Sequence, residues 1–286
     1  MSGYKIFTDT ASELSLERCM KLGILRLTLE VFFGSKKWLN HDDHAAFYEI
    51  LDPENIPTTT GINYEEFNSA AIRTFEEGLD VIYIGLAGSL TPSSVNVCAM
   101  VQQELSEKYP ERRIICLESR CVCGGLEYLV TEAVQKQQAG YSLDQLIQYI
   151  NSIKANIAHH FTSDDLKFYH AGGRISLAER IAGSMLGIRP VMSFTDRDKL
   201  VNQDKARGSK AAIVTIAKKI ATSIVNKNDG RIIISCANCP EKATLMKEQL
   251  LKFLPNAKIE LGHIGPTIGA HAGPTTLAVF CEAEYR

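Results

Sequence analysis

Continuous apolar runs alternate along the chain with segments of helical periodicity. The runs at 79–84 and 231–235 have the length and composition of buried strands. Segments such as 92–108 and 241–254 repeat their apolar residues every three or four positions, which predicts helices. Strands that alternate with helices in this way are typical of an α/β architecture.

Polar residues mark where several helices begin. A capping pair places a short polar side chain three residues before Glu or Gln. The pairs are Asn63 with Glu66, Ser142 with Gln145, and Ser176 with Glu179. They predict helices that begin at 63, run from 142 to about 158, and run from 176 to about 186. Pro92 suits the first turn of its helix, where a missing N–H costs nothing.

The second half of the chain has a less regular rhythm. A strand-like segment at 165–169 precedes the turn at Gly172–Gly173, and 191–194 with 200–201 predict a hairpin. Helices and strands mix here without a strict βαβ order, so we expect an α+β domain. We therefore divide the chain into an N-terminal α/β domain, 1–158, and a C-terminal α+β domain, 159–286.

Composition excludes several classes of protein. The 286 residues are 45% hydrophobic and 22% charged, with a net charge of -2, which argues against a nucleic-acid-binding protein. No apolar stretch approaches the roughly 20 residues that a membrane-spanning helix needs. The first residues lack the features of a signal peptide, and we therefore expect a cytoplasmic protein.

Cysteine and histidine clusters could hold metals, but their spacing does not favour it. Cys236 and Cys239 form a single CxxC after a strand, without the second ligand pair of a structural zinc site. We expect two free thiols on a strand-to-helix turn in a reducing compartment. The pair His41 and His44 lies in a segment that looks exposed, and His159–His160 falls at the expected domain junction. We expect no metal.

Hydroxyl and glycine residues are concentrated next to the predicted strands. The segments are 8–12, 57–61, 85–94 and 118–120. Ligands of open α/β sheets bind beyond the carboxyl ends of the strands, where free N–H groups and hydroxyls bind anions. Ser and Thr also simply cap helices. Four such segments at one sheet edge favour a carboxylate or phosphate site.

Two further segments place one charged or titratable residue among glycines. Segment 264–274 contains three glycines and two prolines around His271, which predicts an irregular, fixed backbone. Arg174 follows Gly172–Gly173 on a tight turn. A histidine and an arginine both suit an anion. A structural histidine and a surface ion pair are the alternatives.

Taken in order, these motifs resemble the DegV family of bacterial fatty-acid-binding proteins. The resemblance covers about residues 4–281. Eight family motifs fall on this sequence in order. They are ITDST at 7–10, TSQPS at 59–63, LSGTYQS at 89–94, DSKS at 118–121, LKKGGRIS at 169–176, IKP at 188–190, RG at 207–208 and IGPxIGAHxGPG at 264–274. The last of these matches almost residue for residue. The sequence departs from TSQPS with Thr-Thr-Gly-Ile-Asn and from LSGTYQS with Ser-Leu-Thr-Pro-Ser-Ser.

The resemblance implies a fold and a ligand. Family members have a Rossmann-like parallel-sheet domain and an α+β domain, with a fatty acid bound between or through them. The acyl chain lies in an apolar tunnel, and Ser, Thr and His side chains meet the carboxylate at the domain interface. Carried over by motif, the carboxylate ligands here are Thr59, Ser89 and His271, with Arg174 nearby. Thr60 lies beside Thr59, and Thr91 or Ser93 is the alternative to Ser89.

The resemblance also implies partners. Some family members present the carboxylate to a separate kinase subunit, which makes an acyl phosphate for phospholipid synthesis. Arg207 would then belong to the kinase-facing surface. We expect no cofactor other than the bound fatty acid, which would be palmitate- or oleate-like. We also expect no chemistry by the protein alone and transient contact with a membrane.

Two enzyme classes are the alternatives. A hydrolase could use Ser89 as nucleophile and His271 as base, but it would need a third group and an oxyanion hole, and no G-x-S-x-G elbow is present. A phosphate- or nucleotide-binding enzyme could use the glycine-rich loops. The sequence has neither a G-x-x-x-x-G-K-[ST] loop nor a G-x-G-x-x-G after a strand.

Overall fold

The computed structural model describes residues 3–177, 187–195 and 199–285, which fall into two compact units. The first consists of Met1–Glu30, Thr59–Val122 and Leu126–Lys154. The second consists of Val31–Thr58, Cys123–Gly125 and Ala155–Arg286. Both are discontinuous, because 31–58 packs within the second unit. The division into domains 1–158 and 159–286 stays a prediction.

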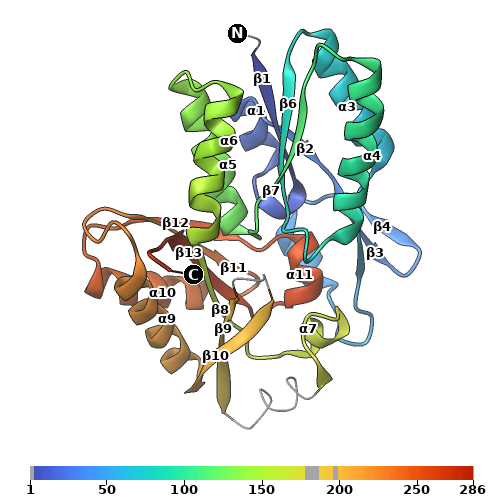
Figure 1. Ribbon diagram of the computed structural model, residues 1–286. Coiled ribbons are helices and arrows are strands. Elements are labelled where there is room, and N and C mark those ends of the chain that lie inside the picture. The colour runs from blue at the N-terminus through green and yellow to red at the C-terminus, as the bar shows by residue number, and fades with distance from the viewer. Residues whose placement is uncertain (1–2, 178–186, 196–198, 286) are drawn as a thin grey trace. The chain divides into compact units, whose positions relative to one another are not determined.

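A four-stranded parallel sheet forms the centre of the first unit (Figure 1). Its order is β2 (Leu25–Leu27), β1 (Tyr4–Asp9), β6 (Asp80–Gly85), β7 (Ile114–Glu118). All six residues of β6 are buried, as its continuous apolar run predicts for a strand covered on both faces. Helices α3 and α4 lie on one side of this sheet, and α5 and α6 lie on the other (Figure 1).

The helices of the first unit are α1 (Leu16–Leu22), α3 (Tyr64–Glu76), α4 (Pro92–Lys108), α5 (Gly124–Gln138) and α6 (Leu143–Ile153), with the short 3-10 turns η1 (Thr10–Ser12) and η2 (Lys154–Asn156). Of these, α3, α4 and α6 begin where the sequence predicts. Asn63 caps α3, and Ser142 with Gln145 forms a complete capping box at α6. The third predicted capping pair leads into 178–186, outside the described residues.

A mixed six-stranded sheet forms the centre of the second unit. Its order is β10 (Leu200–Arg207), β9 (Ile188–Phe194), β8 (Ile157–Thr162), β13 (Leu277–Glu282), β11 (Arg231–Cys236), β12 (Lys258–His263). Only β11 and β12 pair in parallel among these strands, which fits the expected α+β character. The predicted hairpin is confirmed by the antiparallel pairing of β9 with β10.

Two predictions about the second half of the chain are wrong. The helix expected to reach residue 158 ends at Ile153, because 157–162 form the buried strand β8. His159 and His160 therefore lie on a buried strand. The segment expected as a strand at 165–169 instead enters a short helix, α7 (Lys167–Ala171).

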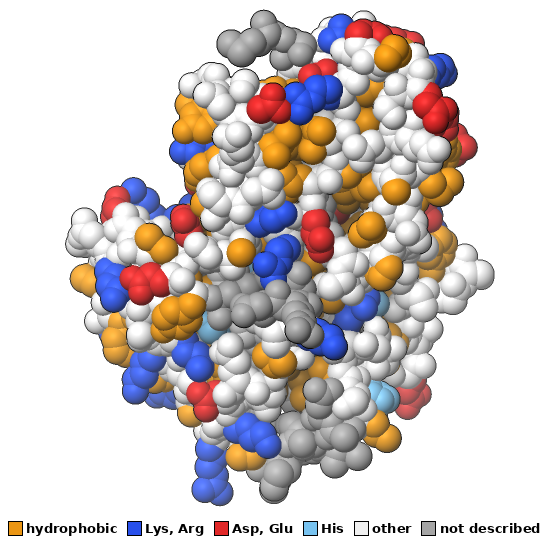
Figure 2. Space-filling model, in the orientation of Figure 1, with side chains coloured by type: hydrophobic (Ala, Val, Ile, Leu, Met, Phe, Trp, Pro, Cys, Tyr) orange, Lys and Arg blue, Asp and Glu red, His pale blue; other side chains and the backbone are white. Residues whose placement is uncertain are grey.

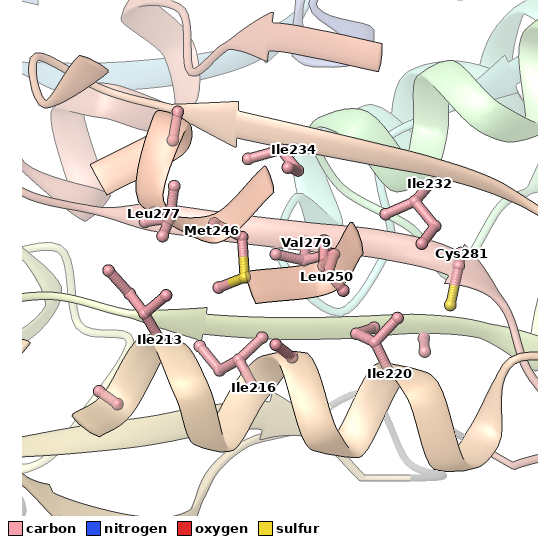
Figure 3. Packing of buried hydrophobic residues seen from close by; sticks show 14 of the residues in the cluster. Ile213, Ile216, Ile220, Ile232, Ile234, Met246, Leu250, Leu277, Val279 and Cys281 are labelled. Carbon is pink, nitrogen blue, oxygen red and sulfur yellow. The ribbon is translucent and has the colours of Figure 1, made fainter. Parts of the chain in front are cut away.

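The core of the second unit lies between one face of its sheet and two helices, α9 (Ser209–Ser223) and α10 (Pro240–Phe253). Ile213, Ile216 and Ile220 of α9 are fully buried, one helical turn apart. Figure 3 shows them against Val279 and Cys281 of β13 and, beyond these, Ile232 and Ile234 of β11. Burying each such side chain contributes roughly 2 kcal/mol, so this packing fixes the sheet from one side.

The remaining elements of the described residues are short. They are β3 (Leu29–Phe33), β4 (Lys36–Trp38), α2 (His44–Glu49), β5 (Thr58–Ile62) and α11 (Pro266–Ala272). Antiparallel β3 and β4 bring Phe33 beside Trp38, and both rings contact Phe47 of α2 with centroids 5.8 Å apart. His41 in this region is buried, whereas the sequence suggested an exposed segment. No helix within the described ranges is long and apolar enough to cross a membrane.

A half-buried carboxylate holds several loops of the second unit together. Asp164 accepts hydrogen bonds from Arg189 Nε, Ser209 Oγ and Lys242 Nζ, each at 2.7 Å. Burial raises the pKa of Asp164, but the hydrogen bonds, first of all from Lys242, outweigh it and leave the pKa below 3.8. The network joins the end of β8 to β9, α9 and α10.

Asp164→Asn should lower the free energy of unfolding of the second unit by about 2 kcal/mol, because charge-assisted bonds to a poorly solvated lysine are lost. Trp38 is the only tryptophan in the sequence and lies in this unit, so urea unfolding followed by its fluorescence measures the change. A folded-state pKa below 3.8 means that the difference from wild type persists at neutral pH and vanishes as the pH falls below 3.8. Asp229→Asn, which alters an exposed pair with Lys258, should have a much smaller effect. Equal losses in the two variants would contradict the role of Asp164.

Candidate functional site

The loops at the carboxyl edge of the parallel sheet are organised around Asp9. This side chain is fully buried at the end of β1 and accepts hydrogen bonds from Ala11 N at 2.9 Å, Tyr83 Oη at 2.6 Å and Leu86 N at 2.8 Å. Burial raises the pKa of Asp9, and the three donors only partly oppose it. The pKa of Tyr83 is raised well above 10.0, by burial and then by Asp9. The carboxylate thus ties the loop after β1 to the loop after β6.

The loop after β6 carries two of the predicted ligands. Ser89 is exposed near its tip, whereas Thr91 is buried just before α4. Thr91 Oγ1 lies 2.8 Å from Ser94 Oγ, which also accepts a hydrogen bond from Ile62 N at 3.1 Å. These bonds attach β5 to the first turn of α4.

Thr59 and Thr60 lie on β5, so the segment expected as a loop at 57–61 is largely a strand. Thr59 is half-buried and Thr60 is exposed. A Cβ atom added to Gly61 would lie only 2.8 Å from Ser94 N, so glycine permits the close approach of β5 to α4. The first unit therefore brings together the hydroxyl groups of β5 and those at the start of α4.

The loop after β7 joins the same edge. Glu118 accepts a hydrogen bond from Gly88 N at 3.1 Å, which connects it to the loop after β6. Ser119 is buried and its Oγ accepts a hydrogen bond from Cys121 N at 3.0 Å, so it serves the turn itself. Three of the four hydroxyl-rich segments thus lie at the carboxyl edge of the first unit's sheet, and the fourth, 57–61, contributes residues 59–61 to this unit.

His271 belongs to the second unit, where it lies on α11. The irregular backbone expected for 264–274 is wrong, because Pro266–Ala272 form a helix with proline in its first turn. The glycines serve close packing instead. A Cβ atom on Gly269 would lie 2.5 Å from the Tyr48 hydroxyl, and Gly273 has a φ of 75° that other residues rarely adopt.

Arg174 and His271 lie close to each other in the second unit. A side chain on Gly172 would clash with the His271 ring, so this glycine lets the end of α7 pack against α11. The pKa of His271 falls to about 4, first because of burial and then because of the charge of Arg174. Burial also lowers the pKa of Arg174. At neutral pH a neutral imidazole therefore stands beside a partly desolvated guanidinium, an arrangement that attracts an anion.

Aromatic rings cover the face of the second sheet that points away from α9 and α10. We call this the aromatic face; its residues are His159 and Phe161 of β8, Phe194 of β9, Phe280 of β13 and Tyr169 of α7. All five are buried. Phe161 stacks on Tyr169 at 6.1 Å between centroids, and His159 meets Phe280 at 5.1 Å. No local sequence pattern predicts this face, because its rings come from separate elements.

The aromatic face is connected to α11 by hydrogen bonds. Tyr169 Oη lies 3.1 Å from Thr276 Oγ1, and Thr276 Oγ1 donates to Ala272 O at 2.6 Å. Ala272 is the neighbour of His271 in the helix. The second unit thus joins a cluster of buried aromatic rings to a polar, positively charged end.

Other candidate residues are placed as follows. Arg207 is exposed at the end of β10. Cys236 ends β11 and Cys239 precedes α10, so the expected strand-to-helix turn is confirmed. Among residues 3–177, 187–195 and 199–285, no group of three or more His, Cys, Asp or Glu side chains could hold a metal ion. Ser89 and His271, the alternative hydrolase pair, belong to different units.

Comparison with known proteins identifies relatives that match nearly the whole of this chain. A family model described as "Uncharacterised protein, DegV family" matches residues 4–284. A DegV domain-containing protein of Clostridium perfringens is 31% identical over 284 residues, which are 98% of this chain and 97% of the relative. A DegV domain-containing protein of Listeria innocua is 27% identical over 278 residues, 96% of each chain.

Solved structures share the fold. DegV of Bacillus subtilis, described as a fatty acid binding protein, has a TM-score of 0.82 at 22% identity and covers 99% of this chain and 100% of its own. A stearic-acid-binding protein of Eubacterium ventriosum has a TM-score of 0.84 at 22% identity and covers 98% of each chain. At these identities the likeness establishes the two-domain α/β fold.

The positive charge of Arg174 leads to a prediction about the pKa of His271. Its pKa should be about 4, and Arg174→Gln should raise it, because a positive charge that disfavours imidazolium is removed. The value should stay below 6.5, since burial is the larger cause. Titration of the histidine ring resonances by NMR measures both. Arg231→Gln, which removes a guanidinium paired with Glu260, is the matched control and should leave His271 unchanged. An unaltered His271 pKa in Arg174→Gln would contradict the assignment.

Proposed function

The chain belongs to the DegV family, and from this membership we propose that it binds a long-chain fatty acid. Several solved structures that share this fold are described with a fatty acid. The relative from Ruminococcus gnavus is described with vaccenic acid, and one from Eubacterium eligens with heptadecanoic acid. The relative from Eubacterium ventriosum is described as binding stearic acid.

The proposal rests on one observation: the aromatic face, Arg174 and His271 lie in the same unit. A fatty acid needs an apolar surface for its chain and a few polar groups for its carboxylate. Burying about fourteen methylenes contributes on the order of 11 kcal/mol, at about 0.8 kcal/mol each. The ordering of a flexible chain offsets part of this. The aromatic face would supply the apolar surface. Residues of α11 and of the turn after α7 would supply the polar end.

The carboxylate would be bound by groups with separate tasks. Arg174 would supply positive charge, and His271, neutral at neutral pH, would donate one hydrogen bond. We propose Thr59, Thr60, Ser89 and Thr91 as the hydroxyl donors of the first unit. A buried carboxylate needs several such donors, because it cannot leave water unpaired. The native acyl chain would be palmitate- or oleate-like.

The protein would carry its ligand rather than transform it. We propose that it presents the carboxylate to a separate fatty acid kinase subunit in the cytoplasm, which forms the acyl phosphate, and that it exchanges cargo in transient contact with a membrane. Arg207 would dock the kinase. Lys205, Arg207 and Lys210 are exposed around the end of β10 and the start of α9. In Figure 2, several Lys and Arg side chains lie in the lower part of the view, where Figure 1 places these elements. Such a surface suits an acidic partner.

The direct test is native mass spectrometry of the purified protein, followed by organic extraction and identification of what is released. The proposal expects an adduct with the mass of a long-chain fatty acid that extraction removes, and its identity gives the preferred chain. A protein that carries no adduct and takes up no added palmitate, oleate or stearate would refute the proposed function.

His271→Ala should weaken oleate or palmitate binding at least tenfold, because the carboxylate loses one donor in a poorly solvated site. Binding can be followed by calorimetry or by displacement of a fluorescent fatty acid. His170→Ala, in the short helix α7, is the matched control and should bind as wild type does. Unchanged affinity in His271→Ala would remove this residue from the site.

Arg207→Glu should leave fatty-acid binding unchanged and lower the rate of acyl-phosphate formation with the kinase at least tenfold, because the charge reversal opposes docking on an acidic surface. Lys227→Glu makes the same charge change at an exposed position after α9 and should retain full activity. Equal kinase activity of Arg207→Glu and wild type would exclude the docking role.

A further inference from the structure

Two thiols outside the proposed lipid site lie together at a position suited to redox chemistry. Cys236 is the last residue of β11, and Cys239 immediately precedes Pro240, the first residue of α10. Strand β11, helix α10 and strand β12 form a βαβ unit, since β11 and β12 are parallel. A CxxC at the strand-to-helix turn of such a unit is the arrangement of thiol–disulfide exchange motifs.

The two side chains differ chemically. A hydrogen bond from the Cys239 side chain lowers the pKa of Cys236 to about 7, burial opposes this, and a backbone hydrogen bond from Cys239 adds to the lowering. The pKa of Cys239 is raised by its pairing with Cys236 and by burial. Cys236 is therefore substantially ionised near neutral pH, which is the state that attacks a disulfide. Both thiols are buried, with Cys236 6% exposed and Cys239 3% exposed.

The turn that holds the thiols is fixed by hydrogen bonds to segment 274–276. Ala237 N donates to Thr276 O at 3.0 Å, and Asn238 N donates to Pro274 O at 2.9 Å. Cys239 Sγ lies 3.3 Å from Thr276 O, which is the alternative acceptor for its single proton. The backbone on both sides of the pair is thus held in place by segment 274–276.

We propose that Cys236 and Cys239 form a reversible disulfide by exchange with a low-molecular-weight disulfide. The Cys236 thiolate attacks one sulfur of the small disulfide, and the first small thiolate leaves as the mixed disulfide forms. Cys239 then attacks Cys236 Sγ, its thiol proton passing to solvent, and the second small thiolate leaves. The two protein thiols are oxidised, the small disulfide is reduced to two thiols, and the two thiol protons balance the two released thiolates.

The chain contains a second thiol pair for comparison. Cys98 of α4 and Cys116 of β7 lie close together in the first unit, where Cys116 Sγ donates to Cys98 O at 3.9 Å. The hydrogen bond to Cys98 and burial raise the pKa of Cys116, so this thiol remains protonated and poorly reactive. The two pairs share proximity but differ in ionisation and in their place in the fold.

The experiment exposes the reduced, full-length protein to oxidised glutathione, alkylates the remaining thiols after denaturation and measures the intact mass. Two of the eight cysteines should escape alkylation, peptide mapping should join Cys236 to Cys239, and dithiothreitol should restore both. Cys239→Ser should instead accumulate a glutathione adduct at Cys236, and Cys236→Ser should form neither product. The Cys98→Ser/Cys116→Ser variant should behave as wild type does.

The wild-type measurement decides the question even if a variant fails to fold. Eight alkylated cysteines after oxidation, or a bond that maps to Cys98 and Cys116, would overturn the proposal. The assay adds no fatty acid and measures only the state of the thiols, so its outcome is distinguishable from that of the lipid-binding test.

Discussion

The loops of the first unit depend on one buried carboxylate. Asp9 receives donors from its own turn, from Tyr83 inside β6 and from Leu86 after it, so the ends of two neighbouring strands share one polar centre. A buried charge is tolerated only when such donors surround it. The same bonds set the start of the loop that carries Ser89 and Thr91. The positions of the hydroxyl-rich loops at this edge therefore depend on the hydrogen bonds that Asp9 accepts.

The second unit positions its polar groups by close packing. Gly172 and Gly269 have no side chain at the points where α11 meets the α7 turn and Tyr48, which allows His271 to lie against Arg174. Larger residues would separate these elements and restore water to the site. The desolvation that lowers the pKa of His271 is thus produced by the glycines of two separate motifs.

Local signals in the sequence predicted much of the fold. Asn63, Ser142 and Pro92 marked helix starts correctly, because capping depends on neighbours in the chain. Helix α11 was missed because its glycines lower helix propensity, while packing against Tyr48 and Phe168 overrides it. Strand β8 was missed because His159–His160 interrupts its apolar run. The motifs indicated the polar candidates, but the aromatic face depends on contacts between distant strands, which no local pattern contains.

The pairing of Arg174 with a neutral histidine has a consequence for an anionic ligand. A bound carboxylate would oppose the charge of Arg174 and raise the pKa of His271, whereas an acyl chain would displace water and lower it. Burial is the larger cause in the free protein, so a ligand that deepens burial favours the neutral imidazole. The positive charge would then come from Arg174, and His271 would contribute a directed hydrogen bond. Lysine at 174 would supply charge without the planar fork of donors that guanidinium offers a carboxylate.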